Sequence, residues 1–252
     1  MKIAIITGAS SGMGRCFVEK LDKRETFDEI WVIARRRERL EELQENVSAK
    51  IRPIALDLTK SESYDEYRAL LDEIKPEVKV LVNASGFGVF SADCDVELSE
   101  KLAMCDLNDK ALVAITHHTL PFMQKGSEIF EIGSLSSFQP VPYIATYAAT
   151  KAFVLSYSRA LNVELKSRGI RVMAVCPGWV KTEFFDHAVK DDTITYYNHY
   201  FTSEQVVNRA LKDMKRGRDV SVVGFDIRAQ VLLTKLLPHR IVMWIWCKQQ
   251  KK

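Results

Sequence analysis

Short apolar runs alternate with segments of helical periodicity along almost the whole chain, and this alternation restricts the folds that it can adopt. The runs are almost continuously apolar, so each is predicted to be a strand that is covered on both faces. They span Lys2–Thr7, Ile30–Ala34, Ile51–Leu56, Val78–Val82, Glu128–Ile132, Ile170–Val175 and Val220–Val223. Such strands, separated by helices, predict a doubly wound α/β fold.

A single Rossmann-type domain is expected. The chain has 252 residues, 47% of them hydrophobic, and no Pro-, Gly- or Ser-rich linker divides it. We predict that residues 1–225 form a seven-stranded, mostly parallel sheet with helices on both faces. Residues 226–252 are predicted to form a C-terminal helical extension, packed on the domain or on a partner.

The composition excludes several function classes. The net charge is only +3 and the charged residues are spread throughout, which argues against nucleic-acid binding. The five cysteines form no Cys-x-x-Cys pair and the histidines show no metal-ligand spacing, so neither a disulfide framework nor a metal site is expected. The N-terminal apolar run is too short for a signal peptide, and a cytoplasmic protein is therefore expected.

A glycine-rich turn connects the first strand to the first helical segment. The turn consists of Gly8, Ala9, Ser10, Ser11, Gly12, Met13 and Gly14. Glycines let the backbone turn tightly and approach a pyrophosphate, and the following helix N-terminus offers free N–H groups. The order strand, turn, helix predicts a dinucleotide-binding site.

The end of the second strand indicates which dinucleotide is bound. An acidic residue about 20 residues after the glycines is typical of NAD binding, and an arginine there is typical of NADP binding. The chain has Ala34 at this place, followed by Arg35 and Arg36. NADP(H) is therefore favoured over NAD(H), with Arg35 as the first phosphate partner. Alternatively, these arginines only begin an exposed charged helix that extends to Asn46.

A possible acid/base pair lies in the helix predicted to extend to Arg168. Tyr147 and Lys151 are four residues apart and share one helix face, so we expect the ammonium to lower the pKa of the phenol. Three more polar residues, Asp57, Asn83 and Ser134, follow strands and are expected at the same edge of the sheet. Asn108, in the helix predicted over Leu98–Met123, could alternatively be a buried structural residue.

Two later segments are compatible with more than one role. Residues 183–201 are rich in aromatic side chains, including Phe184 and Phe185, and could cover a substrate or form a loop that packs on itself. The tail, residues 238–252, combines two tryptophans with lysines. We expect it to dock on its own domain or on a partner subunit, with membrane-surface contact as the alternative.

Together these motifs resemble the classical short-chain dehydrogenase/reductase family, from Lys2 to about Val223. The resemblance implies a catalytic set of Asn108, Ser134, Tyr147 and Lys151, in which the tyrosine follows the serine at the family's usual separation of 13 positions. Substrate contacts are expected for Ser134 and Tyr147 of this set and for Phe184 and Phe185 of the aromatic segment. The resemblance also implies the following cofactor contacts: Gly8, Ser10, Ser11, Gly12, Met13, Gly14, Arg35, Arg36, Asp57, Leu58, Asn83, Ala84, Ser85, Tyr147, Lys151, Pro177, Gly178, Val180 and Thr182.

Two positions depart from the family pattern. The usual Asn-Asn-Ala-Gly is Asn83-Ala84-Ser85-Gly86, and Ser11 replaces the basic residue that precedes the second glycine in NADP-specific members. The resemblance still implies reversible hydride transfer between NADP(H) and a carbonyl group, in a homodimer or homotetramer paired through the helices that carry Asn108 and Tyr147.

The aromatic segment favours a bulky apolar substrate such as a hydroxysteroid. The alternatives are a β-ketoacyl-thioester reductase of lipid synthesis and a non-catalytic NADP(H)-binding protein. The sequence leaves the exact substrate, the stereochemistry and the direction of the reaction open.

Overall fold

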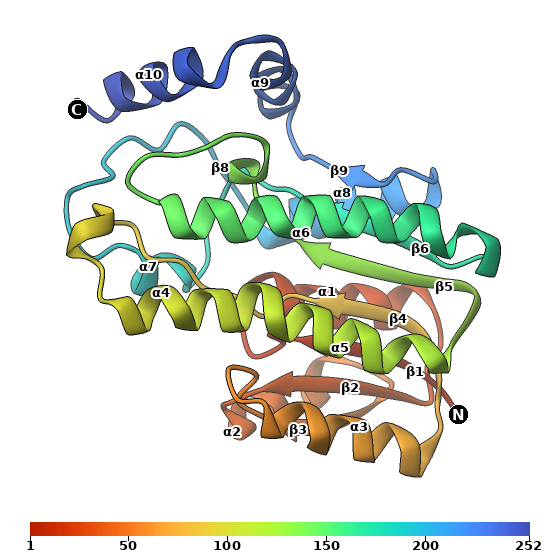
Figure 1. Ribbon diagram of the computed structural model, residues 1–252. Helices are drawn as coiled ribbons and strands as arrows, with labels where there is room; N and C mark the ends of the chain where they lie inside the picture. Colours follow the sequence, from red (N-terminus) through yellow and green to blue (C-terminus); the bar gives the residue numbers. More distant parts are fainter.

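The computed structural model describes all 252 residues, and its central element is a seven-stranded sheet (Figure 1). The strand order is β3-β2-β1-β4-β5-β6-β9, and every pairing is parallel. The strands are β1 (Lys2–Thr7), β2 (Glu29–Ala34), β3 (Lys50–Ala55), β4 (Glu77–Asn83), β5 (Met123–Ile132), β6 (Arg171–Val175) and β9 (Val220–Ser221). The predicted fold class and all seven strands are confirmed.

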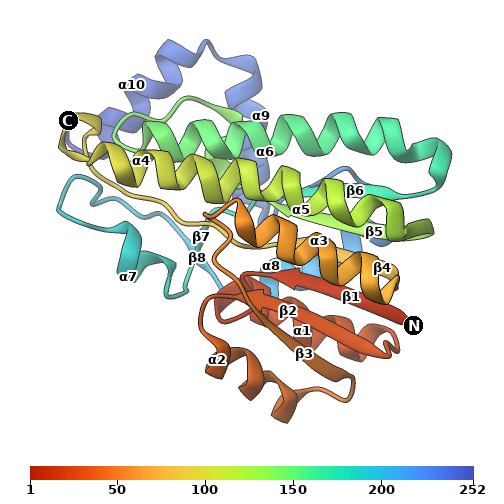
Figure 2. The ribbon, with the colours of Figure 1, turned by 60° about the horizontal axis from the view of Figure 1, so that its bottom comes forward.

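Helices cover both faces of the sheet (Figure 2). On one face lie α1 (Gly12–Arg24), α2 (Arg37–Glu41) and α8 (Ser203–Lys215). On the other lie α3 (Glu62–Ile74), α4 (Leu98–Cys105), α5 (Ala111–Thr119) and α6 (Ala145–Glu164). Side chains of β1 alternate between the two cores, with Ile6 in one and Ile5 in the other, because successive strand residues point to opposite faces. Both faces of the sheet are therefore buried, as the apolar runs predicted.

The helix predicted over Leu98–Met123 is interrupted. A π-helical turn, Asp106–Lys110, separates α4 from α5, and a 3-10 turn with Pro121 follows α5. Proline has no N–H to continue the helical ladder. Asn108 lies inside the π-helical turn and is buried, and such turns are frequent at functional sites.

Another helix prediction is corrected. The helix expected over Arg35–Asn46 is limited to α2, and a 3-10 turn, Glu42–Asn46, follows it.

The helix α8 begins with a capping box whose N-cap is Thr202. Thr202 Oγ1 accepts a hydrogen bond from the backbone N–H of Gln205 at 3.2 Å, and Gln205 Oε1 accepts one from the N–H of Thr202 at 2.9 Å.

The C-terminal part folds over the end of the sheet at which the strands terminate (Figure 1). It contains β7 (Trp179–Val180), α7 (Phe184–Ala188), β8 (Tyr200–Phe201), α9 (Phe225–Leu236) and α10 (His239–Gln249). The last helix docks on its own chain, because Trp246 Nε1 donates to the carbonyl of Pro142 at 3.0 Å. None of the helices combines the length and the apolar composition needed to cross a bilayer.

Candidate active site

Two positions of the glycine turn between β1 and α1 accept only glycine, because the backbone of the protein itself is packed closely there. Gly8 has a φ of +64°, and a Cβ there would lie 2.6 Å from the carbonyl oxygen of Ala84. A Cβ on Gly14 would lie 2.3 Å from the carbonyl oxygen of Gly8. No side chain caps the N-terminus of α1, and its first turn contains no acidic residue. Its free N–H groups and positive dipole end therefore suit a phosphate group.

Arginines gather beside this turn at the end of β2. Arg35 and Arg36 are both exposed, and Arg36 Nη2 donates to Ser10 Oγ at 3.4 Å. Arg39, which the sequence analysis did not single out, forms an ion pair with both carboxylate oxygens of Glu183 at 2.8 Å. Arg36 also lies 3.5 Å from this carboxylate. The cluster could hold the phosphate of an NADP-type cofactor, but the carboxylate of Glu183 offsets part of its positive charge.

The ends of β3 and β4 border the same region. Asp57 Oδ1 accepts hydrogen bonds from Thr59 N and Thr59 Oγ1, at 3.1 and 2.8 Å. Burial alone would raise the pKa of Asp57, but these hydrogen bonds and the charge of Arg35 lower it below its usual range. At the end of β4, the N–H groups of Ala84 and Ser85 both donate to Thr7 Oγ1 at 3.1 Å. Leu58 is buried against α3.

Asn83 has a different environment from the one expected for a cofactor contact. Its side chain is buried, and Nδ2 donates to Thr116 Oγ1 at 2.9 Å and to Glu131 Oε1 at 3.2 Å. The side chain therefore packs inside the protein between β4, α5 and β5. Only the backbone of Asn83 remains for a ligand at the edge of the sheet.

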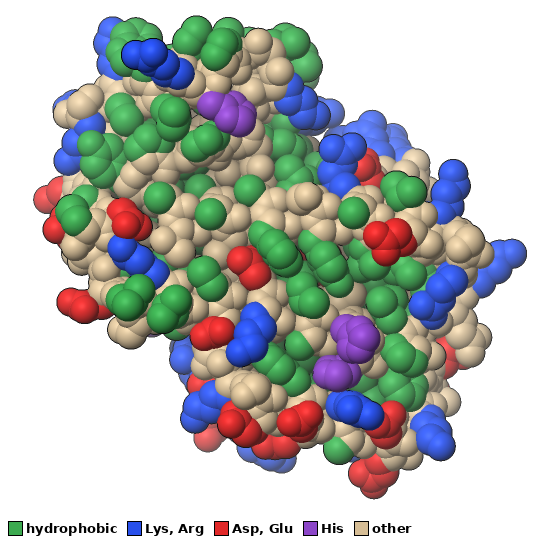
Figure 3. Space-filling model, viewed as in Figure 1, with side chains coloured by type: hydrophobic (Ala, Val, Ile, Leu, Met, Phe, Trp, Pro, Cys, Tyr) green, Lys and Arg blue, Asp and Glu red, His purple; other side chains and the backbone are tan.

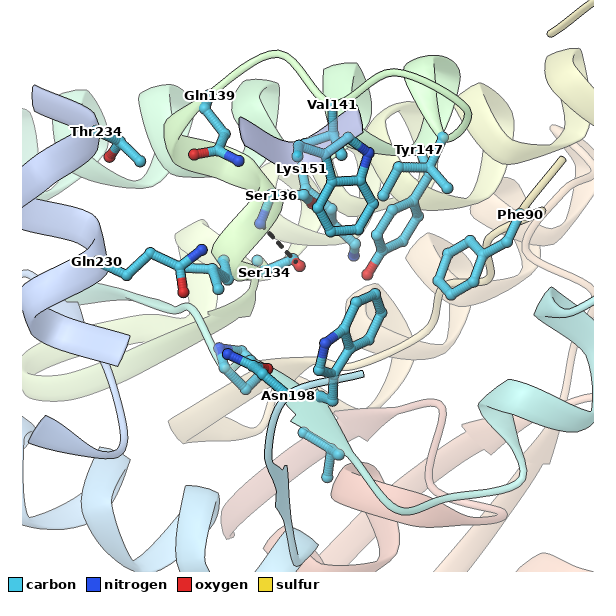
Figure 4. Close-up of a pocket in the computed structure, with 18 of the residues that line it drawn as sticks. Phe90, Ser134, Ser136, Gln139, Val141, Tyr147, Lys151, Asn198, Gln230 and Thr234 are labelled. Atoms are coloured by element: carbon cyan, nitrogen blue, oxygen red, sulfur yellow. Dashed lines mark hydrogen bonds between the residues drawn. The ribbon is translucent and has the colours of Figure 1, made fainter. Parts of the chain in front are cut away.

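Ser134, Tyr147 and Lys151 come together at the end of β5 and the start of α6. In Figure 4 the polar ends of the three side chains are directed toward one another. Ser134 Oγ accepts from Ser136 N at 3.2 Å, so its own proton remains available for another acceptor. Lys151 Nζ donates to the carbonyl of Ile132 at 2.8 Å and lies 5.8 Å from the ring centre of Tyr147. The sequence therefore identified three residues that the fold does bring together.

The acid/base properties of this group differ from the expectation. We expected the ammonium of Lys151 to lower the pKa of Tyr147. Instead, burial raises the pKa of Tyr147 to about 12, although the nearby Ser134 hydroxyl opposes this shift. Burial also lowers the pKa of Lys151 to about 8. The reason is desolvation, which destabilises a buried phenolate and a buried ammonium alike and is the largest cause of both shifts.

Asn108 fixes the backbone next to this group. Its Nδ2 donates to the carbonyl of Phe87 at 2.9 Å and to Thr150 Oγ1 at 3.0 Å, and its Oδ1 accepts from Phe87 N at 3.0 Å. A Cβ on Gly86 would lie 2.9 Å from Asn108 Oδ1 and 3.4 Å from Lys151 Nζ. Asn108 thus connects the loop after β4 to the helix that carries Tyr147 and Lys151.

Glu131 is a buried carboxyl group that the sequence analysis missed. It is completely buried in β5 and accepts from Asn83 and from Thr116, whose Oγ1 donates to Oε1 at 3.1 Å. Burial raises the pKa of Glu131 to about 8, so the carboxyl group is mostly protonated at neutral pH. Its position between the apolar residues Phe130 and Ile132 near the end of β5 was the signal that could have identified it.

A mostly apolar cavity of about 390 Å³ opens beside Tyr147 (Figure 4). Eight of the predicted cofactor residues lie on its wall: Met13, Ala84, Tyr147, Lys151, Pro177, Gly178, Val180 and Thr182. Both predicted aromatic substrate residues, Phe184 and Phe185, also line it. The sequence analysis missed other lining residues, namely Phe90, Val141, Trp179, Leu233, Ile245 and Trp246. These come from distant parts of the chain, and no local pattern connects them.

Comparison with known proteins agrees with this site. The family profile "short chain dehydrogenase" matches residues 2–193. Very-long-chain 3-oxoacyl-CoA reductase from Rattus norvegicus is 33% identical, and the match covers 97% of this chain and 77% of the relative. For 17-beta-hydroxysteroid dehydrogenase type 3 from Danio rerio the identity is 31%, over 86% of this chain and 71% of the relative.

Among solved structures, a short-chain dehydrogenase from Sphingobium yanoikuyae in complex with NADPH superimposes with a TM-score of 0.79 at 26% identity, covering 94% of each chain. The match to the family profile extends over the glycine turn, the reaction centre and the strands between them. The chain therefore belongs to the short chain dehydrogenase family and is an oxidoreductase that acts on alcohol and carbonyl groups.

Proposed function

We propose that the protein interconverts a bulky apolar ketone, such as a ketosteroid, and the corresponding secondary alcohol, with NADP(H) as the hydride carrier. One observation carries the proposal. The polar ends of Ser134, Tyr147 and Lys151 meet at one wall of a cavity whose other walls are mostly apolar and aromatic. Such a cavity favours a large hydrophobic substrate with one polar group, since unpaired polar groups of a ligand would lose their hydration there.

In the direction of reduction, NADPH held at the glycine turn would supply the hydride for the carbonyl carbon, and the protein supplies the proton for the oxygen. Ser134 donates a hydrogen bond to that oxygen, because a carbonyl oxygen can only accept and the contact with Ser136 N leaves the hydroxyl proton of Ser134 free. Tyr147 transfers its phenolic proton to the developing alkoxide. Its pKa of about 12 keeps it protonated at neutral pH, as an acid needs.

Lys151 provides a positive charge beside the phenol as the proton leaves, and its hydrogen bond to the carbonyl of Ile132 fixes its position. We assign Asn108 a positioning role, since its side chain holds Phe87 and Thr150 rather than facing the substrate. Thr150 Oγ1 in turn donates to the carbonyl of Tyr147 at 2.8 Å. This chain of contacts orients the first turn of α6, and hence the phenol.

The choice of NADP(H) over NAD(H) rests on the end of β2. Ala34 stands where an NAD-binding protein has an acid, Arg35 and Arg36 follow it, and Arg36 reaches Ser10 in the glycine turn. The NADPH complex of the Sphingobium relative supports this choice. We assign the remaining contacts to Gly8, Ser10, Ser11, Gly12, Met13, Gly14, Asp57, Leu58, the backbone of Asn83, Ala84, Ser85, Pro177, Gly178, Val180 and Thr182.

A second candidate is reduction of a β-ketoacyl thioester with a long chain. It is supported by the rat relative, which is named as a 3-oxoacyl-CoA reductase and matches almost the whole chain. The apolar cavity would then hold the acyl chain in place of a fused ring system. Both candidates use the same chemistry at Tyr147, and they differ in the shape of the substrate.

The test is oxidation of NADPH, followed by absorbance, with ketosteroids, 3-oxoacyl thioesters of short and long chain, and small polar aldehydes. We expect kcat/KM to be highest for one of the two bulky apolar groups. Preference for ketosteroids supports the first candidate, and preference for long-chain thioesters supports the second. A preference for small polar aldehydes would contradict both candidates, because such substrates gain little from apolar walls.

We also propose that copies of the chain pair through α4 and α6. Leu98 and Leu102 on α4, and Phe153 and Val163 on α6, expose apolar side chains on one face of the molecule. The charged residues on these helices are of both signs, so two such faces can approach each other. Sedimentation of the wild type and of a Phe153→Glu variant would test this, with a smaller assembly expected for the variant.

A further inference from the structure

The outer surface of α9 and α10 exposes a second group of large apolar side chains. We call it the C-terminal patch, and it consists of Phe225, Leu232, Leu233, Leu236, Ile241, Trp244 and Ile245. Phe225 is 80% exposed, Leu236 is 70% exposed and Trp244 is 62% exposed. Phe225, Leu232 and Leu236 follow one face of α9, and Ile241, Trp244 and Ile245 follow one face of α10. Isolated exposed apolar residues are ordinary, but a continuous group on two helices indicates a binding surface.

The side chains around the C-terminal patch are strongly basic. Residues 225–252 contain six Lys or Arg and a single Asp, whereas the rest of the chain has a slight excess of acids. All six cations are exposed, and none of them forms an ion pair. They are Arg228, Lys235, Arg240, Lys248, Lys251 and Lys252. In Figure 3, basic and hydrophobic side chains lie together at the end of the molecule that α9 and α10 form.

The patch is continuous with the cavity of the active site. Leu233 and Ile245 belong to the C-terminal patch and also line that cavity. On the inner side of the same helices, Thr234 and Trp246 face the cavity (Figure 4 shows Thr234). The two helices are therefore a thin wall, with the apolar cavity on one side and an exposed apolar surface on the other.

We propose that the C-terminal patch docks on an anionic lipid membrane and lies in its interface. Exposed leucines and tryptophan next to unpaired lysines have the composition of a surface-lying helix, in which apolar groups enter the acyl boundary and cations contact the headgroups. Trp244 and Lys248 already combine these roles, since Lys248 Nζ lies 5.1 Å from the ring centre of Trp244. A second copy of the chain is a poorer occupant, because two such patches would bring like charges together.

This proposal goes beyond the catalysed reaction and does not depend on it. The closing experiment measures co-sedimentation of the full-length protein with vesicles of phosphatidylcholine alone and of phosphatidylcholine mixed with phosphatidylglycerol. We expect binding to the anionic vesicles only, and we expect high salt to weaken it. Absence of binding to anionic vesicles would overturn the proposal, whatever substrate the enzyme reduces.

Substitutions in the C-terminal patch test whether this surface binds the membrane. Leu236 and Trp244 do not line the cavity, so the double variant Leu236→Gln and Trp244→Gln removes apolar area without touching the active site. We expect at least about tenfold weaker vesicle binding. The control is Lys212→Gln with Lys215→Gln, two exposed residues of α8 that lie outside the C-terminal patch, the cavity and the helices proposed to pair, and it should bind as the wild type does.

A second variant replaces Lys248, Lys251 and Lys252 by Gln and keeps the apolar groups. We expect its affinity for anionic vesicles to fall on the order of fivefold for each charge removed. Because these lysines are exposed and unpaired, folding of this variant should be unaffected. Unchanged vesicle binding of both variants would overturn the proposal. The proposal would also be overturned if either variant formed a smaller assembly in sedimentation but still bound vesicles. The C-terminal patch would then be an interface between copies of the chain.

Discussion

The reaction centre at Tyr147 and the arginine cluster at the end of β2 differ in their exposure to solvent. At the reaction end, Tyr147 and Lys151 are almost completely buried, and burial shifts both pKa values strongly. At the other end, Arg35 and Arg36 are exposed to solvent, and Arg36 lies 3.5 Å from the carboxylate of Glu183. Buried groups interact strongly and titrate at unusual pH, whereas exposed charges interact weakly and are screened by salt. Substitutions at the two ends should therefore differ in size, in pH dependence and in salt dependence.

The largest effect is expected for Tyr147→Phe. The variant loses the only proton donor proposed for the substrate oxygen, so kcat should fall on the order of a thousandfold. The NADPH dissociation constant, measured by fluorescence titration, should change little. Tyr157→Phe is the control on the same helix, and it should retain turnover. Wild-type activity in the Tyr147 variant would refute the role that we propose for this residue.

The next effect concerns pH. Lysine carries its charge below its pKa, so with a pKa of about 8 Lys151 is charged at neutral pH and loses its proton as the pH rises. We expect kcat for reduction to fall above about pH 8, approaching tenfold for each further pH unit. The KM for NADPH should change less, since the arginines stay charged throughout. A flat kcat profile up to pH 10 would contradict a requirement for charged Lys151.

The buried residues behind the reaction centre can be tested by thermal unfolding, without an activity assay. The pKa of Glu131 is raised in the folded state. Its favourable contribution to the free energy of unfolding is therefore complete below its ordinary pKa of 4.5 and is lost as the pH rises through about 8. Glu131→Gln cannot ionise. Its Tm should therefore exceed that of the wild type by roughly 5 °C at pH 9, and by much less at pH 5. The same difference at both pH values would show that Glu131 does not titrate in this range.

At the exposed end, Arg36→Ser should raise the KM for NADPH by about tenfold at low salt and leave the KM for NADH unchanged. The control is Arg37→Ser, since Arg37 pairs only with Glu41 on the surface of α2. An equal rise in the KM values for NADPH and NADH would mean that Arg36 does not distinguish the two cofactors.

The smallest effect is expected for Glu183→Gln. Removing this carboxylate leaves the charges of Arg36 and Arg39 uncompensated, so NADPH should bind about twofold to threefold more tightly. High salt should abolish the difference. Glu204→Gln, which breaks an exposed pair with Lys20 on the distant side of α1, is the control. Weaker NADPH binding in the Glu183 variant would indicate that the carboxylate orders the arginines rather than competing for them.

The sequence predicted the features that depend on local pattern. Continuous apolar runs identified all seven strands of the sheet, and the glycine spacing identified the turn at Gly8 and Gly14, because these signals need only neighbouring residues. The π-helical turn at Asn108 was missed because hydrogen bonds to Phe87, a residue remote in sequence, accompany it. The pKa of Tyr147 was predicted in the wrong direction because its burial depends on packing that a helix pattern does not contain.

The cavity wall was predicted only in part for the same reason. Phe184 and Phe185 were identified from an aromatic run, but Phe90, Val141 and Trp246 are far apart in the sequence and meet only after the chain has folded. The docking of α10 on its own chain, in contrast, was one of the expected arrangements of the tail.

The attachment of α10 has a consequence for local unfolding. Gln250 Oε1 accepts from the N–H groups of both Thr195 and Tyr196 at 3.0 Å, while Trp246 holds the loop at Pro142 that precedes the helix of Tyr147. Few contacts thus join three segments that are distant in sequence. When α10 detaches, the amides of Thr195 and Tyr196 lose their acceptor, so their hydrogen exchange should report the same opening event as the amides of α10.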